Sequence, residues 1–328
     1  MRETTEERIL GSGFRGELLP LPQTEDGWFV AGRDRTASVW TPRDRKVEFA
    51  VRDDGVLCRV KSLSGYPAYY PLHEAALQPP ARYVLMDLDG TSVRSEWFWM
   101  WIIEQTTAGL LGRPDFRLSE EDQPFVSGHS VSEHLQYCID RYCPGRSLEE
   151  ARALYFDITR REMREIMEGR GREGAFTPAP HLREFLETLK RHGIRIGLVT
   201  SGLTEKAMPE IVSAFRTLGM GDPRDFYDVI ISAGTSLTAG QVGTLGELEA
   251  KPHPWLYAEA GRVGLGGRWE DGTTVALEDS SAGVVAARLA GYPCLGIEGG
   301  NIRRSGTACL CSGMYADLMD TLPFILGK

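Results

Sequence analysis

YVLMDLDGT, residues 83–91, is the motif around which the chain is organised. Its first four residues are apolar and β-prone, which is typical of a strand buried on both faces. Such a strand delivers Asp87 and Asp89 to its carboxyl end, the edge at which open α/β sheets bind ligands. Gly90 permits a tight turn there, and Thr91 can bond to local backbone. One carboxylate can act as a nucleophile and metal ligand while its neighbour transfers a proton.

The segment DLDG, residues 87–90, is also typical of an ordinary turn after a strand. A calcium loop is a third interpretation, but it requires further oxygen ligands at alternating positions and a later Glu. The next residues, 92–94, are Ser, Val and Arg, which argues against calcium. The motif alone therefore leaves both a turn and an active site open.

Three later segments place polar residues beside predicted strand ends or helix starts. The apolar runs at 194–199 and 275–277 predict two more buried strands. The first strand is followed by Thr200-Ser201-Gly202 and the second by Glu278-Asp279-Ser280. The third segment, Lys251-Pro252-His253-Pro254, precedes a predicted helix. The three segments add a hydroxyl, a distal acidic pair and a cation to the carboxylates of the central motif. Strands that alternate with helices predict a parallel sheet with right-handed crossovers.

Together these motifs, in this order, resemble the haloacid dehalogenase (HAD) superfamily, and more closely its phosphatase and β-phosphoglucomutase branch. The resemblance covers about residues 82–300. It implies a HAD-type phosphoric monoester hydrolase: a magnesium-dependent phosphatase that acts on a small phosphorylated metabolite through an aspartyl-phosphate intermediate. It also implies a Rossmann-like α/β core with a helical cap inserted after the first motif. In that family the cap closes over the site, which excludes water and positions the substrate.

The motifs supply each group that phosphoryl transfer requires: a positioned nucleophile, charge neutralisation and a proton donor. Asp87 is the candidate nucleophile. Asp89 is the candidate acid and base, which would protonate the leaving alkoxide and then activate water. Thr200-Ser201-Gly202 can bind phosphate oxygens through a hydroxyl and backbone N–H groups. Lys251 can neutralise both the phosphate and Asp87.

A magnesium site is expected beside the nucleophile, because Mg²⁺ prefers a few carboxylates together with water and phosphate oxygens. Asp87 and Asp279 are the expected side-chain ligands. The family resemblance adds the carbonyl oxygen of Asp89. Glu278 is expected to bind the metal directly or through water.

Two histidines near the motifs receive different interpretations. Gly128-His129-Ser130 lies between predicted cap helices and resembles the family's substrate-specificity loop, so His129 and Ser130 are candidate substrate-binding residues. Ser130 also fits the first position of a capping box, and both roles are compatible. His253 is predicted to begin a helix rather than to act in catalysis.

Two alternative functions remain open. A sugar phosphomutase of the β-phosphoglucomutase type resembles this chain, but the His and Arg of such mutases correspond here to Trp99 and Val131. A binding protein that retains a HAD fold without turnover is the second alternative. Dehalogenases and phosphonate hydrolases of the superfamily lack the second Asp, so Asp89 argues against both. Arg94 departs from the Asp common at that position in relatives, which leaves the substrate class open.

The sequence predicts three domains. They are an N-terminal β-rich appendage and linker at 1–80, an α/β core at 81–93 plus 176–328, and a helical cap at 94–175. In the appendage, strands are predicted at 28–31, 37–40, 47–52 and 56–61, with a hairpin at Asp53-Asp54-Gly55. Residues 1–25 lack periodicity and are predicted to be extended or partly disordered. Near the other end, 308–310 is predicted to form an edge strand.

Composition limits the partners and the compartment. The net charge of −9 and pI near 5.3 argue against nucleic acid as a partner. The first eight residues lack the apolar core of a secretory signal, and the apolar run at 97–103 is far shorter than the roughly 20 residues that span a bilayer. The six scattered cysteines indicate a reducing, cytoplasmic compartment. Cys309-Leu310-Cys311 is interpreted as strand cysteines rather than a metal site. The oligomeric state is left open.

Overall fold

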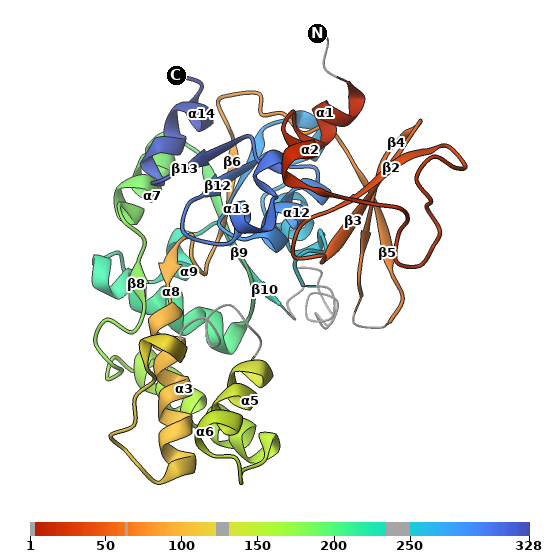
Figure 1. The fold of residues 1–328 in the computed structure, drawn as a ribbon. Helices are drawn as coiled ribbons and strands as arrows, with labels where there is room; N and C mark the ends of the chain where they lie inside the picture. Colours follow the sequence, from red (N-terminus) through yellow and green to blue (C-terminus); the bar gives the residue numbers. More distant parts are fainter. Residues whose placement is uncertain (1–3, 63–64, 123–130, 234–249) are drawn as a thin grey trace. The chain divides into compact units, whose positions relative to one another are not determined.

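A six-stranded parallel sheet forms the centre of the computed structural model, in the order β10-β9-β6-β11-β12-β13. Its strands are β6 (Tyr83–Asp87), β9 (Arg195–Leu203), β10 (Val229–Ala233), β11 (Thr274–Glu278), β12 (Cys294–Ile297) and β13 (Gly313–Tyr315). The predicted parallel α/β core is therefore confirmed. Because β6 lies between β9 and β11, the motif of Asp87 ends in the middle of the sheet (Figure 1).

The structure describes residues 4–62, 65–122, 131–233 and 250–328. They divide into two compact units. The larger contains Met1–Ser92, Ala179–Ala207 and Met220–Lys328, and the smaller contains Val93–Pro178 and Met208–Gly219. The first 80 residues thus belong to the same unit as the parallel sheet. The predicted three-domain boundaries stay a prediction.

Helices surround the parallel sheet in the larger unit. They are α7 (Leu182–Arg191), α8 (Thr204–Leu218), α9 (Pro223–Phe226), α11 (Trp255–Ala258), α12 (Ser281–Leu289), α13 (Ile302–Ser305) and α14 (Leu322–Leu326), with the later part of α8 in the smaller unit. Local sequence explains the start of α12, because the Ser280 hydroxyl accepts the Gly283 N–H at 3.1 Å as an N-cap. Among the described residues, no helix is both long and apolar enough to cross a membrane.

The N-terminal region forms a five-stranded antiparallel sheet in the order β1-β2-β3-β4-β5. Its strands are β1 (Leu19–Leu21), β2 (Thr36–Thr41), β3 (Val47–Arg52), β4 (Gly55–Val60) and β5 (Ala68–Leu72). The hairpin predicted at Asp53-Asp54-Gly55 is confirmed, since Arg52 pairs with Gly55 in the β3–β4 ladder. The small antiparallel sheet expected from the alternating pattern is therefore present.

Two predictions for the N-terminal region are wrong. Residues 28–31 form no strand: Val30 makes only an isolated bridge with Gln23, and Trp28 is 77% exposed, with its ring stacked on that of Tyr69 rather than paired in a ladder. The first 25 residues are not simply extended, because they contain α1 (Thr5–Leu10) and α2 (Phe14–Glu17). These short helices form because Leu10 and Phe14 are fully buried, which offsets the cost of ordering them.

The edge strand predicted at 308–310 is also wrong. Those residues form a 3₁₀ helix, η4 (Ala308–Leu310), and the edge of the sheet is β13 instead. Leu310 and Cys311 donate their N–H groups to Thr307 and Ala308 at 3.1 and 3.0 Å, so the segment turns rather than extends. Three apolar residues are too few to distinguish a turn from a strand.

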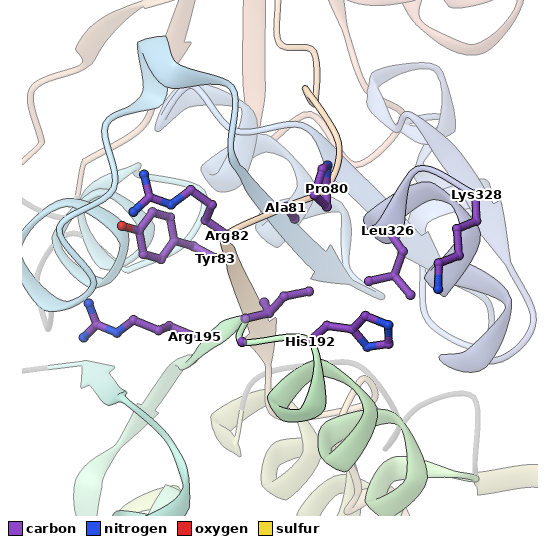
Figure 2. Close-up of a pocket in the computed structure, with 10 residues that line it drawn as sticks. Pro80, Ala81, Arg82, Tyr83, His192, Arg195, Leu326 and Lys328 are labelled. Carbon is purple, nitrogen blue, oxygen red and sulfur yellow. The ribbon is translucent and has the colours of Figure 1, made fainter.

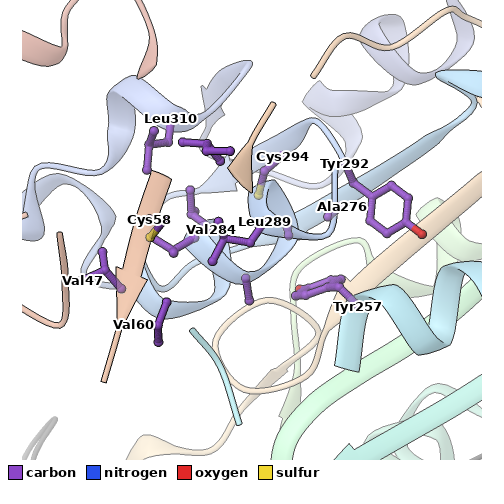
Figure 3. Packing of buried hydrophobic residues seen from close by; sticks show 14 of the residues in the cluster. Val47, Cys58, Val60, Tyr257, Ala276, Val284, Leu289, Tyr292, Cys294 and Leu310 are labelled. Atoms are coloured by element: carbon purple, nitrogen blue, oxygen red, sulfur yellow. The ribbon is translucent and has the colours of Figure 1, made fainter. Parts of the chain in front are cut away.

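Helix α12 joins the two sheets of the larger unit (Figure 3). Its Val284 and Leu289 belong to one buried apolar cluster with Cys58 and Val60 of the antiparallel sheet and Cys294 of the parallel sheet. Burial of apolar side chains on both faces of one helix makes the antiparallel sheet part of the core.

Arg288, on the same helix, connects three separate segments. Its buried guanidinium donates to the carbonyl oxygens of Ile9, His73 and Leu310, each at 2.9 Å. Burial lowers the pKa of Arg288 below its ordinary value, because it disfavours the charged form. The N-terminal helices, the linker and η4 are therefore tied to α12 by one side chain.

The smaller unit is helical. Helices α3 (Glu96–Leu111), α5 (Val131–Tyr142) and α6 (Leu148–Met167) pack against one another, and β7 (Val93–Arg94) pairs with β8 (Thr177–Pro178) at the two ends of the insertion (Figure 1). The helical insertion predicted between the first and second core strands is present.

Replacement of Arg288 by Leu should destabilise the protein strongly, because three carbonyl oxygens lose their donor, two of them in buried contacts. We expect the free energy of unfolding, measured in urea, to fall by about 3 kcal/mol. The control is Arg183→Leu, which removes an exposed i,i+4 ion pair with Glu187 and should cost less than about 0.5 kcal/mol. Equal, small effects of both variants would contradict this account of Arg288.

Candidate active site

The carboxyl ends of three adjacent strands bring the predicted residues together. Asp87 ends β6, Glu278 ends β11, and Thr200 lies in β9, one residue past the partner of Asp87 in the ladder. These strands are neighbours in the sheet, so their ends meet at one edge. All three side chains belong to buried residues. The strand order therefore assembles a polar site from segments that are far apart in the sequence.

Lys251 lies at the centre of this site. Its ammonium group donates to Asp87 Oδ1 at 2.5 Å, to Glu278 Oε1 at 2.7 Å and to the Val199 carbonyl oxygen at 3.1 Å. The Lys251 side chain is only 5% exposed. All three donor positions of the ammonium are thus used, and its charge is shared between two carboxylates.

Glu278 is held by four donors. Besides Lys251, the Tyr257 hydroxyl donates to Oε1 at 2.7 Å, while the backbone N–H and hydroxyl of Ser280 donate to Oε2 at 3.3 and 3.0 Å. A Cβ on Gly283 would lie 1.9 Å from the Glu278 carboxylate, so only glycine fits there. Glu278 is therefore fixed in place and is suited to orient Lys251. Sequence reasoning did not identify Tyr257 or this second role of Ser280, because no spacing rule relates them to Glu278.

The carboxylate of Asp279 is packed against two glycines. A Cβ on Gly90 would lie 2.0 Å from Asp279 Oδ2, and one on Gly300 would lie 2.1 Å from the Asp279 carbonyl oxygen. Gly90 also has a φ of +85°, which side chains other than glycine rarely adopt. The turn glycine of the central motif thus has a second function: it clears space for the distal acid.

A divalent cation fits the chemistry of this group. Oxygen atoms of Asp87, Glu278 and Asp279 all lie within 4.8 Å of one another, and all three residues are buried. Three carboxyl groups lie near the ammonium of Lys251, so their full ionisation would leave an excess of buried negative charge. Carboxylate oxygens are ligands that Mg²⁺ prefers. Since Glu278 is already occupied by four donors, Asp87 and Asp279 are the better placed ligands.

The close packing of these buried charged groups shifts the pKa values of Asp87, Asp279 and Lys251. Burial raises the pKa of Asp87 well above its usual range, and the neighbouring Glu278 adds to the shift, while Lys251 opposes it. Burial likewise raises the pKa of Asp279 to about 8, again with Glu278 contributing. Burial alone would lower the pKa of Lys251, but the Asp87 and Glu278 carboxylates raise it above its ordinary value. The lysine therefore stays charged while the acids resist ionisation.

The segment Thr200-Ser201-Gly202 adjoins the lysine. The Thr200 hydroxyl accepts the Gly202 N–H at 3.0 Å, and the Ser201 hydroxyl accepts the Lys251 N–H at 3.2 Å. Ser201 therefore holds the backbone of Lys251 in addition to its predicted contact with phosphate. The phosphate-binding roles of the segment stay predictions.

Three other predicted site residues are not placed by these contacts. Asp89 is half-buried and is not among the three carboxylates that the described part of the chain groups within 4.8 Å. His129 and Ser130 lie outside the described residues. Their catalytic and substrate-binding roles stay predictions.

A cavity of about 450 Å³ lies at the opposite edge of the sheet (Figure 2). Arg82, Tyr83 and Arg195, at or just before the amino ends of β6 and β9, contribute to its lining together with His192. Arg195 already donates to the Leu265 carbonyl oxygen at 2.7 Å. This lining contains no carboxylate side chain that could act as a nucleophile or hold a metal ion. The cavity is therefore no alternative to the carboxyl edge.

Replacement of Gly90 by Ala should displace Asp279 and weaken magnesium binding by about ten- to a hundredfold. Gly32→Ala is the matched control, because Gly32 has a φ of +75° but nothing within 4 Å of its added Cβ. Both variants carry similar backbone strain. A difference between their Mg²⁺ affinities, measured by isothermal titration calorimetry, therefore reports the clash of the new Cβ with Asp279. Equal Mg²⁺ affinities in the two variants would show that the contact with Asp279 is unimportant.

Magnesium binding should depend on pH. The pKa of Asp279 is raised from 3.8 to about 8, so the metal-free protein holds a proton there at neutral pH. That proton must leave when a cation binds, and the Mg²⁺ association constant should rise by about tenfold per pH unit from pH 6 towards 8. Calorimetry in buffers of different ionisation enthalpy counts the protons released. A constant affinity with no proton release would contradict the assignment of Asp279 as a ligand.

Comparison with known proteins agrees with this geometry. The family model for haloacid dehalogenase-like hydrolases matches residues 84–297. No curated protein sequence gives a significant match. Among solved structures, CbbY from Rhodobacter sphaeroides in complex with phosphate is 22% identical (TM-score 0.51) and covers 74% of this chain and 96% of its own. A predicted phosphoglycolate phosphatase from Haemophilus somnus is 17% identical (TM-score 0.54; 75% and 99% covered).

A putative β-phosphoglucomutase from Thermotoga maritima is 20% identical, with a TM-score of 0.53 and coverage of 74% of this chain and 98% of its own. At such identities these structures show a shared fold. The family model spans all four motifs, from the strand that carries Asp87 to the strand after Asp279. The chain belongs to the haloacid dehalogenase-like hydrolase family.

Proposed function

We propose that this hydrolase is a magnesium-dependent phosphatase that cleaves a small phosphorylated metabolite through an aspartyl phosphate on Asp87. The observation that carries the proposal is the 2.5 Å contact between Asp87 and the buried ammonium of Lys251, at the carboxyl edge of the parallel sheet. Family membership and the phosphate in the CbbY structure support a phosphoryl substrate.

Lys251 favours the anionic form of Asp87 against the effect of burial. A carboxylic acid is a poor nucleophile, and burial favours the protonated form of Asp87. The adjacent ammonium opposes that effect and remains positioned to neutralise phosphoryl oxygens as charge develops on them. Glu278 and Val199 hold the ammonium in this position.

Asp87 and Asp279 would hold the magnesium ion, which when bound neutralises negative charge on the phosphoryl group. In the first step, the Asp87 carboxylate attacks phosphorus as the bond to the leaving oxygen breaks. Asp89 supplies the proton that this oxygen requires. In the second step, Asp89 takes a proton from water, which attacks phosphorus and releases Asp87 and inorganic phosphate.

The mutase alternative is less well supported. The resemblance to mutases calls for a His and an Arg where this chain has Trp99 and Val131. A cytoplasmic enzyme without nucleic-acid partners is part of the same proposal, in keeping with the net charge of −9. Turnover assays of the purified protein on a panel of phosphorylated metabolites would identify the substrate and separate hydrolysis from phosphoryl migration.

Asp87→Asn should abolish turnover, because an amide is a poor nucleophile towards phosphorus and supplies no charge to a metal. Release of inorganic phosphate from a verified substrate is the measurement. Asn at this position keeps the size of the side chain, so thermal unfolding should show an intact fold. Wild-type turnover in this variant would exclude the proposed mechanism.

Asp89→Asn should retain an ionised nucleophile but lose proton transfer, which is typically worth about a hundred- to ten-thousandfold. With p-nitrophenyl phosphate the leaving group needs no proton, so the first step should survive and the second should stall. A stoichiometric burst of nitrophenolate, with phosphate retained on the protein, is the expected result. Unimpaired turnover on an alkyl phosphate would assign the proton transfer to another residue.

A further inference from the structure

His253 connects the N-terminal sheet to the segment that carries the catalytic lysine. The residue is buried, and its ring uses both nitrogens: Nδ1 lies 2.8 Å from the Tyr70 hydroxyl and Nε2 lies 3.1 Å from the Lys61 carbonyl oxygen. A carbonyl oxygen only accepts, so Nε2 donates to Lys61, and in the neutral ring Nδ1 accepts from Tyr70. The Tyr70 ring also packs edge-on against His253, with centroids 5.8 Å apart.

Tyr70 belongs to β5, at the edge of the antiparallel sheet, and lies 183 residues from His253 in the sequence. Its ring is also 6.2 Å from that of Trp255, the first residue of α11. The N-terminal sheet thus contacts Trp255, two residues after His253, as well as His253 itself. The same helix carries Tyr257, whose hydroxyl donates to Glu278.

The segment Lys251-Pro252-His253-Pro254 is stiff. Each proline fixes its own φ and restricts the residue before it, so the backbone of both Lys251 and His253 is constrained. Ser201 holds the Lys251 N–H at one end, and Tyr70 holds the His253 ring at the other. Movement of His253 would therefore be passed to Lys251 rather than absorbed between them.

We propose that Tyr70 and His253 position Lys251, so that the N-terminal sheet is a structural part of the active site. This inference rests on the proposed function for its kinetic consequence. His253 is a positioning residue, because its two ring nitrogens bond to the Tyr70 hydroxyl and the Lys61 carbonyl oxygen. The sheet that lies outside the matched family region acts through it on the lysine.

The test compares two tyrosine hydroxyls on the same strand. Tyr70→Phe removes the hydrogen bond to His253 but keeps the ring. Tyr69→Phe is the matched control, since that hydroxyl bonds to Asp26 on the opposite face of the sheet. With p-nitrophenyl phosphate, Tyr70→Phe should lower kcat by about ten- to a hundredfold, and Tyr69→Phe should leave it near the wild-type value. Equal losses in both variants would overturn the proposal.

A double-variant cycle shows whether Tyr70 acts through the lysine. In a Lys251→Met background, Tyr70→Phe should cause no further loss of kcat, because the group that it positions is gone. The same loss in both backgrounds would contradict the inference. His253→Asn, whose amide can reach the Nδ1 position, should retain more activity than His253→Ala; equal activities would also contradict it.

A measurement that does not depend on turnover separates this inference from the proposed function. Lys251 is nearly inaccessible, so an amine-reactive ester should label it slowly. Peptide mass spectrometry should show several-fold faster labelling in Tyr70→Phe and unchanged labelling in Tyr69→Phe. An inactive wild-type protein with this labelling pattern would refute the phosphatase proposal alone. Unchanged labelling in Tyr70→Phe would refute the positioning role.

Discussion

The ammonium of Lys251, held between Asp87 and Glu278, is the interaction on which the candidate site depends. Moving charges out of water is costly, and an incompletely paired buried group is more costly still. Here the ammonium has three acceptors, and Glu278 has four donors drawn from Lys251, Tyr257 and Ser280. When ionised, Asp87 and Asp279 carry the remaining negative charge, and a divalent cation would neutralise it.

The antiparallel sheet contributes to this site through packing as well as through His253. Helix α12, which begins directly after Asp279, buries apolar side chains against both sheets and holds the N-terminal segments through Arg288. Residues at the end of β11 are therefore supported by parts of the chain that precede the family's matched region. A region that the sequence suggests is an appendage is part of the same folded unit.

Much of this architecture can be predicted from the sequence, because buried parallel strands are continuous apolar runs. The strands ending near Asp87, Thr200 and Glu278 all follow that pattern, and their polar ends meet as expected. The predictions at 28–31 and 308–310 are wrong because short β-prone runs do not reveal whether a partner strand is present. The start of α1 does carry a sequence signal, because Thr4 and Glu7 form a capping box.

Contacts between distant segments are the part that sequence patterns do not reveal. Tyr70 and His253 are each ordinary in their local sequence, and only the fold brings them within 2.8 Å. The same holds for Gly90, whose turn conformation is predictable while its contact with Asp279 is not. Local rules place residues at strand ends and caps, but packing decides which of them meet.

A crystal structure grown with Mg²⁺ and trifluoroberyllate, an analogue of a phosphoryl group, tests the central claim most directly. We expect the analogue on an Asp87 oxygen, with Mg²⁺ about 2.1 Å from oxygens of Asp87 and Asp279. Lys251 should still contact Glu278 and should lie beside the analogue. Attachment to any other residue, or a Lys251 ammonium turned away from Asp87, would contradict the account.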